Sequence, residues 1–113
     1  MIRILGDHKL DLDISKLEFE ERVDSEVYGT TILYFIGPKE LISYKHPEAE
    51  SAEIMIEFNT NNPHGQYPEI MISPTKGGRD YDWYYAYVDD PDLVKRLIEI
   101  GLSGGKEKNE RIL

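Results

Sequence analysis

The residue types most often used for catalysis or metal binding are few and scattered in this chain. His8, His46 and His64 are its only histidines, and no two of them have the i, i+4 spacing of a helical metal site. His8 beside Asp7 has the types of a general base and an orienting acid, but all three histidines fall in predicted turns or loops, where a surface role is the simpler interpretation. No nucleophile elbow or phosphate-binding loop is present, so we expect a protein that is not an enzyme.

The sequence also gives no support for cysteine chemistry or for a metal site. The chain has no cysteine, which excludes disulfides, thiolate catalysis and cysteine-ligated zinc. Its densest acids are Asp80, Asp82 and the group at 89–92, and the second group is better explained as the cap and first turn of a helix than as calcium ligands. The sequence therefore predicts neither a metal nor a cofactor.

One polar loop could hold a small ligand. The stretch "NTNNPHGQYP" at 59–68 places His64 among four side-chain amides and a threonine. Arg79, in the glycine-containing segment "TKGGRD", could supply a positive charge to such a site. A small-molecule-binding protein or minor enzyme using His64 and Arg79 is therefore kept as an alternative.

The strongest signal for recognition is the stretch "YDWYYAYVDD" at 81–90, which contains four of the eight tyrosines and the only tryptophan. In a strand, alternate side chains point to opposite faces. One face would carry Tyr81, Trp83, Tyr85 and Tyr87, and the other Asp82, Tyr84, Ala86 and Val88. If a helix covers the second set, the first set forms an outward aromatic row rimmed by acids, which is the composition of an interface hot spot.

The chain is strongly acidic, with 22 acids, 13 bases and a net charge of −9. Residues 1–90 hold 18 acids and 8 bases, so the charge belongs to the body of the domain. Such a field disfavours direct binding of nucleic acids or anionic membranes and favours encounter with a basic protein. Charge that only keeps the chain in solution is the alternative explanation.

Most of the 113 residues read as short strands. The candidate strands are 1–5, 9–14, 16–23, 28–37, 40–44, 52–58, 69–73 and 81–88. The strand at 28–37 is apolar on both faces, which predicts a central position. In the strand at 52–58, Glu53 and Glu57 should face outward while alternate isoleucines face the core.

A helix should follow the last strand. Asp90 can cap it, Pro91 suits its first position, and Gly101 is expected to end it in a left-handed conformation. We therefore expect one α+β domain over residues 1–102, with a mostly antiparallel sheet of about five to seven strands and one C-terminal helix packed on one face. Residues 103–113 are expected to form a flexible tail.

One helix cannot cover a sheet of that size, so part of one face should be available to a partner. The preferred function is that of a small acidic domain that neutralises or inhibits a basic protein. Contacts are expected at Glu53, Glu57, Asp82, Trp83 and Tyr84. In general character, though in no motif, such a domain is similar to bacterial immunity proteins, antitoxins and small phage-encoded inhibitors, whose partners are often nuclease toxins or defence effectors.

A homodimer formed through the spare sheet face is a further alternative. No secretory leader and no apolar run of membrane-spanning length is visible, so the expected location is the cytoplasm, without membrane contact.

Overall fold

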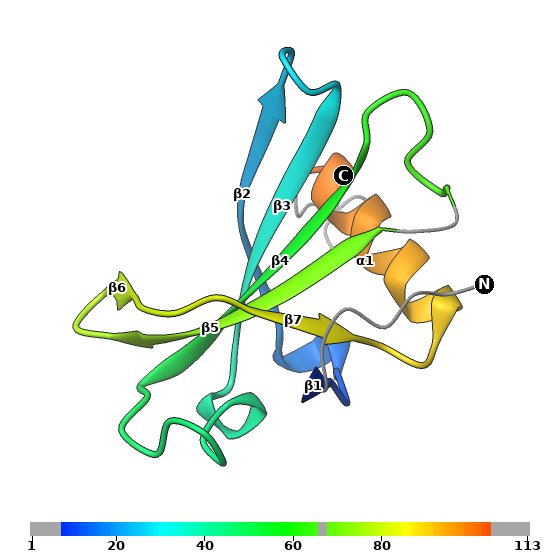
Figure 1. Ribbon diagram of the computed structural model, residues 1–113. Helices are drawn as coiled ribbons and strands as arrows, with labels where there is room; N and C mark the ends of the chain where they lie inside the picture. The colour runs from blue at the N-terminus through cyan, green and yellow to red at the C-terminus, as the bar shows by residue number, and fades with distance from the viewer. Residues whose placement is uncertain (1–7, 66–67, 105–113) are drawn as a thin grey trace, which may run out of the picture.

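One seven-stranded sheet and one α-helix make up the part of the chain that the structure, a computed structural model, describes: residues 8–65 and 68–104 (Figure 1). The strands are β1 (His8–Lys9), β2 (Glu18–Ser25), β3 (Thr30–Gly37), β4 (Ser51–Asn59), β5 (Glu69–Lys76), β6 (Arg79–Asp80) and β7 (Tyr84–Tyr87). The helix is α1 (Pro91–Leu102), and two 3-10 turns are η1 (Ile14–Lys16) and η2 (Lys39–Leu41). The predicted α+β class is confirmed.

The sheet is built on a meander of four long strands. Its order is β1-β7-β5-β4-β3-β2, with β6 paired to β5 off this path. All pairs are antiparallel except β1 with β7, which run parallel. The strands fan apart across the sheet, and α1 lies against one face only (Figure 1). The opposite face, which we call the open face, has no helix over it from residues 8–65 or 68–104.

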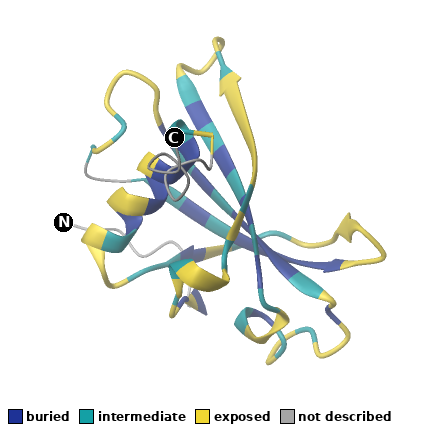
Figure 2. Cartoon of the chain, turned by 180° about the vertical axis from the view of Figure 1, so that it is seen from behind, coloured by how far each residue is buried: buried dark blue, intermediate teal, exposed yellow. Residues whose placement is uncertain are grey.

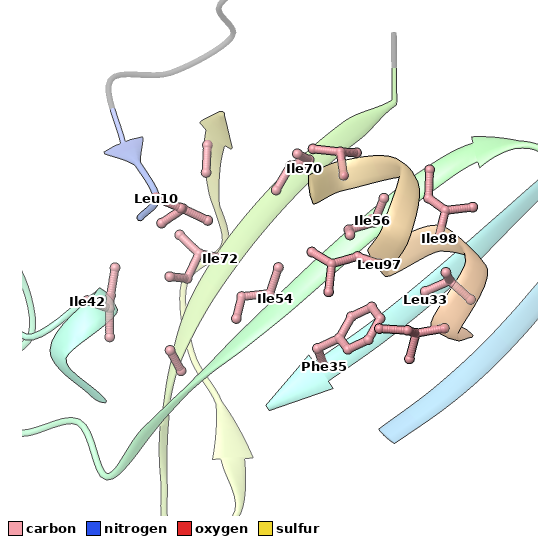
Figure 3. Packing of buried hydrophobic residues seen from close by; sticks show 14 of the residues in the cluster. Leu10, Leu33, Phe35, Ile42, Ile54, Ile56, Ile70, Ile72, Leu97 and Ile98 are labelled. Carbon is pink, nitrogen blue, oxygen red and sulfur yellow. The ribbon is translucent and has the colours of Figure 1, made fainter. Parts of the chain in front are cut away.

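The core lies between α1 and the sheet face beneath it. Alternation along β3 and β4 sends Leu33, Phe35, Ile54 and Ile56 to this face, and all four are essentially inaccessible to solvent (Figures 2 and 3). The burial pattern of these strands follows the two-residue period that the sequence predicted. Each such side chain contributes about 1.5–3 kcal/mol relative to an exposed one.

The helix begins as predicted and ends later than predicted. Asp90 accepts hydrogen bonds from the backbone N–H groups of Asp92 and Leu93, and Pro91 occupies the first helical position. Gly101 does not end the helix but lies buried inside its last turn. The left-handed glycine is Gly104, with φ of 71°. Gly101 serves close packing instead, because an added Cβ would lie 2.3 Å from Cδ1 of Leu33.

Several strand predictions were wrong in extent. The alternating segment 9–14 forms only the two-residue β1 and the turn η1, although Leu10 is buried as its pattern required. The predicted strand at 40–44 is η2 followed by turns. Strand β5 runs through Pro74 instead of ending there. The strand predicted at 1–5 lies outside the described residues, as does most of the predicted tail.

The segment "TKGGRD" is a tight hairpin and not the flexible connection that its composition suggested. Gly77 and Gly78 have φ of 63° and 76°, which only glycine adopts without strain. The hairpin turns β5 back into β6, pairing Thr75 with Asp80. This pairing directs Asp80 to the open face.

Candidate functional site

The open face is organised by cross-strand rows. Register places one row straight across five strands, so that each of its members lies beside the next. That row is Glu21, Tyr34, Met55, Met71 and Tyr85. Its three inner members are large and apolar or aromatic, and Tyr85 at one end is 41% exposed. An apolar stripe therefore crosses the middle of a sheet face that no helix covers.

Acids lie on both sides of this stripe. One neighbouring row pairs Glu18 with Ile36 and Ile36 with Glu53, and the other pairs Ile32 with Glu57 and Glu57 with Glu69. Burial and the negative charge of Glu57 raise the pKa of Glu69. Glu57 thus lies close enough to Glu69 to disfavour the charged form of Glu69.

Bases are nearly absent from the same face. Among the described strand residues whose register directs them to it, Lys9 on the edge strand β1 is the single base. Its Nζ is 3.2 Å from Oδ2 of Asp89, and this contact raises the pKa of Lys9. Among the described strand residues, Lys9 is therefore the one cation of this face, and it is paired with Asp89 and not with the acids of the cross-strand rows.

A hollow of about 500 Å³ interrupts the stripe. Side chains of β2, β3, β4 and β5 line it together with two residues of the segment after the Gly77–Gly78 turn. The lining residues are Glu20, Glu21, Val23, Tyr34, Glu53, Met55, Met71, Asp80 and Trp83. Glu20 reaches the hollow because a register shift between Phe19 and Glu21 leaves it unpaired in a β-bulge. We call this site the Glu53 hollow.

Glu53 is the least accessible acid of the open face, with 6% of its surface exposed. Burial, hydrogen bonds with Asp80 and Glu20, and the negative charge of these two groups raise the pKa of Glu53 from 4.5 to about 9. At neutral pH this carboxyl therefore holds a proton. Burial, followed by the negative charges of Glu53, Glu21, Asp80 and Glu57, also raises the pKa of the Tyr34 hydroxyl.

The aromatic stretch divides between two faces, as its alternation predicted. Ala86 is buried and Val88 packs against the core on the helix side, whereas Tyr85 faces outward. Trp83 lines the Glu53 hollow and meets Tyr34 edge to face, with ring centroids 6.3 Å apart. Only Tyr84–Tyr87 of this stretch form a strand, although the backbone N–H of Tyr81 also donates a hydrogen bond to the carbonyl of Pro74 on β5.

The five predicted contact residues do not all share one surface. Glu53, Glu57 and Trp83 lie on the open face, Glu53 unexpectedly buried. Tyr84 packs toward the core on the helix side, and its hydroxyl contacts Asp82. Asp82 and Tyr84 therefore belong to a separate cluster.

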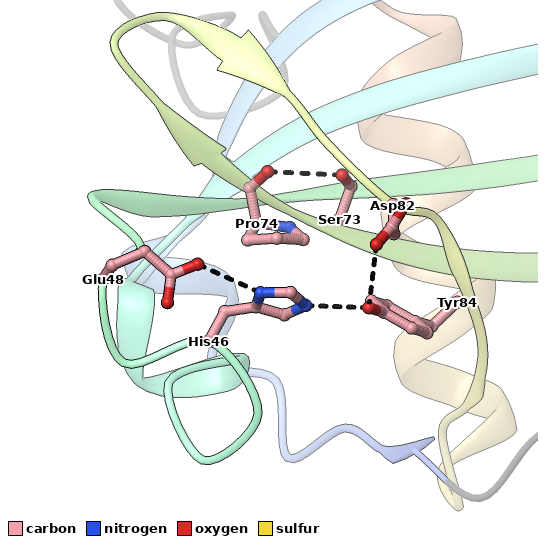
Figure 4. A network of polar contacts seen from close by, with 6 residues as sticks. All are labelled: His46, Glu48, Ser73, Pro74, Asp82 and Tyr84. Atoms are coloured by element: carbon pink, nitrogen blue, oxygen red, sulfur yellow. Dashed lines mark hydrogen bonds and ion pairs between the residues drawn. The ribbon is translucent and has the colours of Figure 1, made fainter.

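That cluster centres on the ring of Tyr84 (Figure 4). His46 Nε2 lies 2.8 Å from the Tyr84 hydroxyl, and His46 Nδ1 lies 3.1 Å from Oε2 of Glu48. Nζ of Lys45 sits 4.8 Å from the centre of the Tyr84 ring. The contacts tie the loop after η2 to strand β7.

His8 extends the same cluster and corrects the expectation of a surface histidine. It is 7% exposed, hydrogen-bonds the Tyr44 hydroxyl through Nδ1, and its ring centroid is 5.1 Å from that of Tyr84. The sequence offered no sign of this, because the parallel pairing of β1 with β7 brings His8 to Tyr84, and Tyr44 comes from the turns after η2.

His64 and Arg79 are not brought together. His64 is exposed, and its Nε2 lies 3.2 Å from Oε2 of Glu99 on α1. Arg79 lies on β6 beside Lys76, in the hairpin at another edge of the sheet (Figure 1). A second open hollow beside His64 is lined by helix residues, without Arg79. The structure therefore does not place His64 and Arg79 in the lining of one hollow.

Metal and membrane sites were also sought. Within residues 8–65 and 68–104, no group of three or more His, Asp or Glu side chains is arranged to hold a metal ion. No helix in these ranges has the length and apolar character needed to span a bilayer.

Comparison with known protein families, with curated proteins and with solved structures finds no significant match to this chain.

Proposed function

We propose that this chain binds and neutralises a basic protein through the open face of its sheet, in the manner of an immunity protein, an antitoxin or a phage-encoded inhibitor. The observation that carries the proposal is the apolar row from Tyr34 to Tyr85, flanked by acids and short of bases. A partner such as a nuclease toxin or defence effector is basic because its substrate is a polyanion.

The arrangement matches what protein interfaces need. Tyr34, Met55, Met71 and Tyr85 offer an apolar centre that a partner can desolvate, and aromatic residues dominate such centres energetically. Glu18, on the edge strand, is exposed and available for long-range attraction. Carboxylates at the rim favour fast association and reject acidic partners.

The same charges disfavour a homodimer through this face. Two copies placed face to face would oppose Glu18, Glu57 and Glu69 with their own equivalents, without bases to alternate with them. Like charges brought together across an interface cost several kcal/mol. A partner of opposite charge avoids this cost.

Capture followed by an activity assay tests the proposal. The tagged chain is incubated at low salt with lysate of cells that naturally encode it, and bound proteins are identified and purified. We expect a basic protein whose activity falls on adding the chain, with binding weakened at high salt.

A matched tyrosine pair provides the control. Tyr85→Ala removes an aromatic group from the open face and should weaken binding by about 2 kcal/mol, as expected for a hot spot. Tyr28→Ala removes an 80% exposed tyrosine from the β2–β3 turn and should leave binding unchanged. Equal effects of the two substitutions, or a partner whose activity is unaffected, would contradict the proposal.

A further inference from the structure

The Glu53 hollow joins flat aromatic surface to apolar surface. Trp83 and Tyr34 form an edge-to-face pair on its lining, and Met55, Met71 and Val23 add apolar contacts. Thioether side chains adapt to the shape of whatever packs on them. The lining therefore suits an inserted group that has both an apolar stem and a planar end.

The side chains of the lining that can carry a charge near neutral pH are all acids: Glu20, Glu21, Glu53 and Asp80. Glu20, Glu53 and Asp80 meet there, and no base among the described residues forms an ion pair with any of them. Three carboxyl groups in contact, one of them buried, cannot all carry charge. A cation supplied by another molecule would balance the negative charge of these carboxyl groups.

We propose that the Glu53 hollow receives a single arginine side chain from the basic partner, an inference that rests on the proposed function. The guanidinium would lie against Trp83 and donate hydrogen bonds to the carboxylates of Glu53 and Asp80. Its carbon stem would cover the methionines.

Arginine fits this lining better than the other cations. Its planar group carries five donors, stacks on aromatic rings, and is more weakly hydrated than a lysine ammonium. A divalent metal would need several converging oxygen ligands, whereas much of this lining is aromatic, aliphatic or thioether.

Binding should release a proton. The guanidinium favours the ionised form of Glu53, whose pKa is about 9 before binding. Arginine should therefore bind more tightly as pH rises toward 9, by up to about tenfold per pH unit. The charged or titratable groups facing Glu53 are Glu20 and Glu21 from β2, Tyr34 from β3 and Asp80 from β6, and β5 adds only Met71 and Ser73.

Trp83 provides a direct reporter, since it is the only tryptophan of the chain and lines the hollow. The full chain is titrated with end-capped Gly-Arg-Gly, and the emission of Trp83 is followed at several pH values. Matched peptides carry lysine or citrulline, the second being a neutral analogue with the shape of arginine. We expect a saturable response to arginine, a weaker one to lysine and none to citrulline.

Two variants separate the hollow from the rest of the open face. Glu53→Gln replaces the protonated acid with a neutral analogue of the same shape, so the fold should be retained. It should weaken arginine binding about tenfold, the factor for one lost hydrogen bond to a charged group, and remove the dependence on pH. Glu57→Gln, on the same strand outside the lining, should leave both nearly unchanged.

Equal responses to arginine and citrulline, or arginine binding that Glu53→Gln leaves intact, would overturn the inference. An equal response to lysine would overturn the choice of arginine. Because the peptides need no partner, failure here would leave the capture experiment as an independent test of the proposed function. If the chain binds the arginine peptide saturably but captures no basic protein, the proposed function fails and the arginine site remains.

Discussion

At the scale of single residues, Glu53 is the group whose environment departs furthest from that of an ordinary surface acid. Glu53 points away from the core on β4, so on an isolated strand it would be exposed. In the sheet, acids of β2 and β6 pack against it and help to bury it. A carboxyl in such a site is stabilised in its protonated form, whereas the unfolded chain ionises it at its ordinary pKa of 4.5.

This difference makes stability depend on pH. Between pH 4.5 and about 9 the folded state holds a proton on Glu53 that the unfolded state has lost, so the free energy of unfolding should fall as pH rises through this window. Glu53→Gln should reduce this decrease in the free energy of unfolding, and the variant should be more stable than the wild type at pH 8. Urea denaturation from pH 5 to 9 measures both, with Glu18→Gln, at an exposed position of the edge strand β2, as a control that keeps the fall.

Acids whose pKa is lowered in the folded state affect stability at a pH below that window. Hydrogen bonds from Ser15 lower the pKa of Asp13, and hydrogen bonds from Thr31 and Arg22 lower that of Asp24. Their contribution is complete above the ordinary carboxyl pKa and is lost only in stronger acid. A wild-type curve that stays level from pH 5 to 9 would contradict the account of Glu53.

The hydroxyl of Tyr84 is a second residue-scale feature. It contacts His46 and Asp82, so Tyr84→Phe should lower the free energy of unfolding by about 1 kcal/mol. It should also speed hydrogen exchange in the loop 42–50, which this contact ties to β7. Tyr85→Phe on the opposite face should change neither, and equal effects of the two variants would show that the hydroxyl contacts contribute nothing.

At the scale of elements, the close packing of α1 on β3 depends on the absence of a side chain at Gly101. Gly101→Ala would place a methyl group 2.3 Å from Cδ1 of Leu33, which must move or push the helix outward. We expect a loss of about 1–3 kcal/mol, although alanine is the better helix former by about 1 kcal/mol. Thermal or urea unfolding measures the loss.

A double-mutant cycle assigns this loss to the contact. Leu33→Ala removes the atoms that the new methyl group would meet, so Gly101→Ala should cost less in that background than in the wild type. Lys95→Ala, on the exposed side of α1, should change stability by no more than about 0.5 kcal/mol. Full additivity of the two core substitutions would contradict close packing at Gly101.

At the scale of the whole molecule, the effect of the net charge of −9 on association depends on where the acids lie in the structure. Strand β2 is an edge of the sheet, and its charged residues and bulge discourage pairing with another sheet edge. At this edge they favour the face of the sheet, rather than the edge strand, as the surface for the proposed recognition.

Charge reversal on the open face tests this at the level of association. Glu18→Lys with Glu57→Lys should slow association with the proposed basic partner about tenfold or more at low salt, with a smaller effect at high salt. Glu26→Lys with Glu40→Lys changes the net charge equally in a turn and in η2, away from the cross-strand rows, and should slow it much less. Stopped-flow kinetics across ionic strengths measures both, and equal slowing would mean that net charge alone matters.

Much of the fold was predictable because it depends on local periodicity. The two-residue alternation of "AEIMIEF" predicted which side of β4 faces the core, and Asp90 with Pro91 predicted where α1 begins. The division of Tyr84–Tyr87 between two faces followed from the same geometry once a helix came next. Patterns of this kind are set by neighbouring residues, so the amino-acid sequence by itself determines them.

The sites depended on contacts that no local pattern encodes. Glu20, Glu53 and Asp80 meet because of a bulge in β2 and a hairpin after β5, and His8 reaches Tyr84 through a parallel pairing of distant segments. Burial of a side chain is a property of everything that surrounds it in space. Sequence therefore determined the acidity and the faces of the strands, and only the tertiary structure decided which acid is buried and which aromatic residue stands beside it.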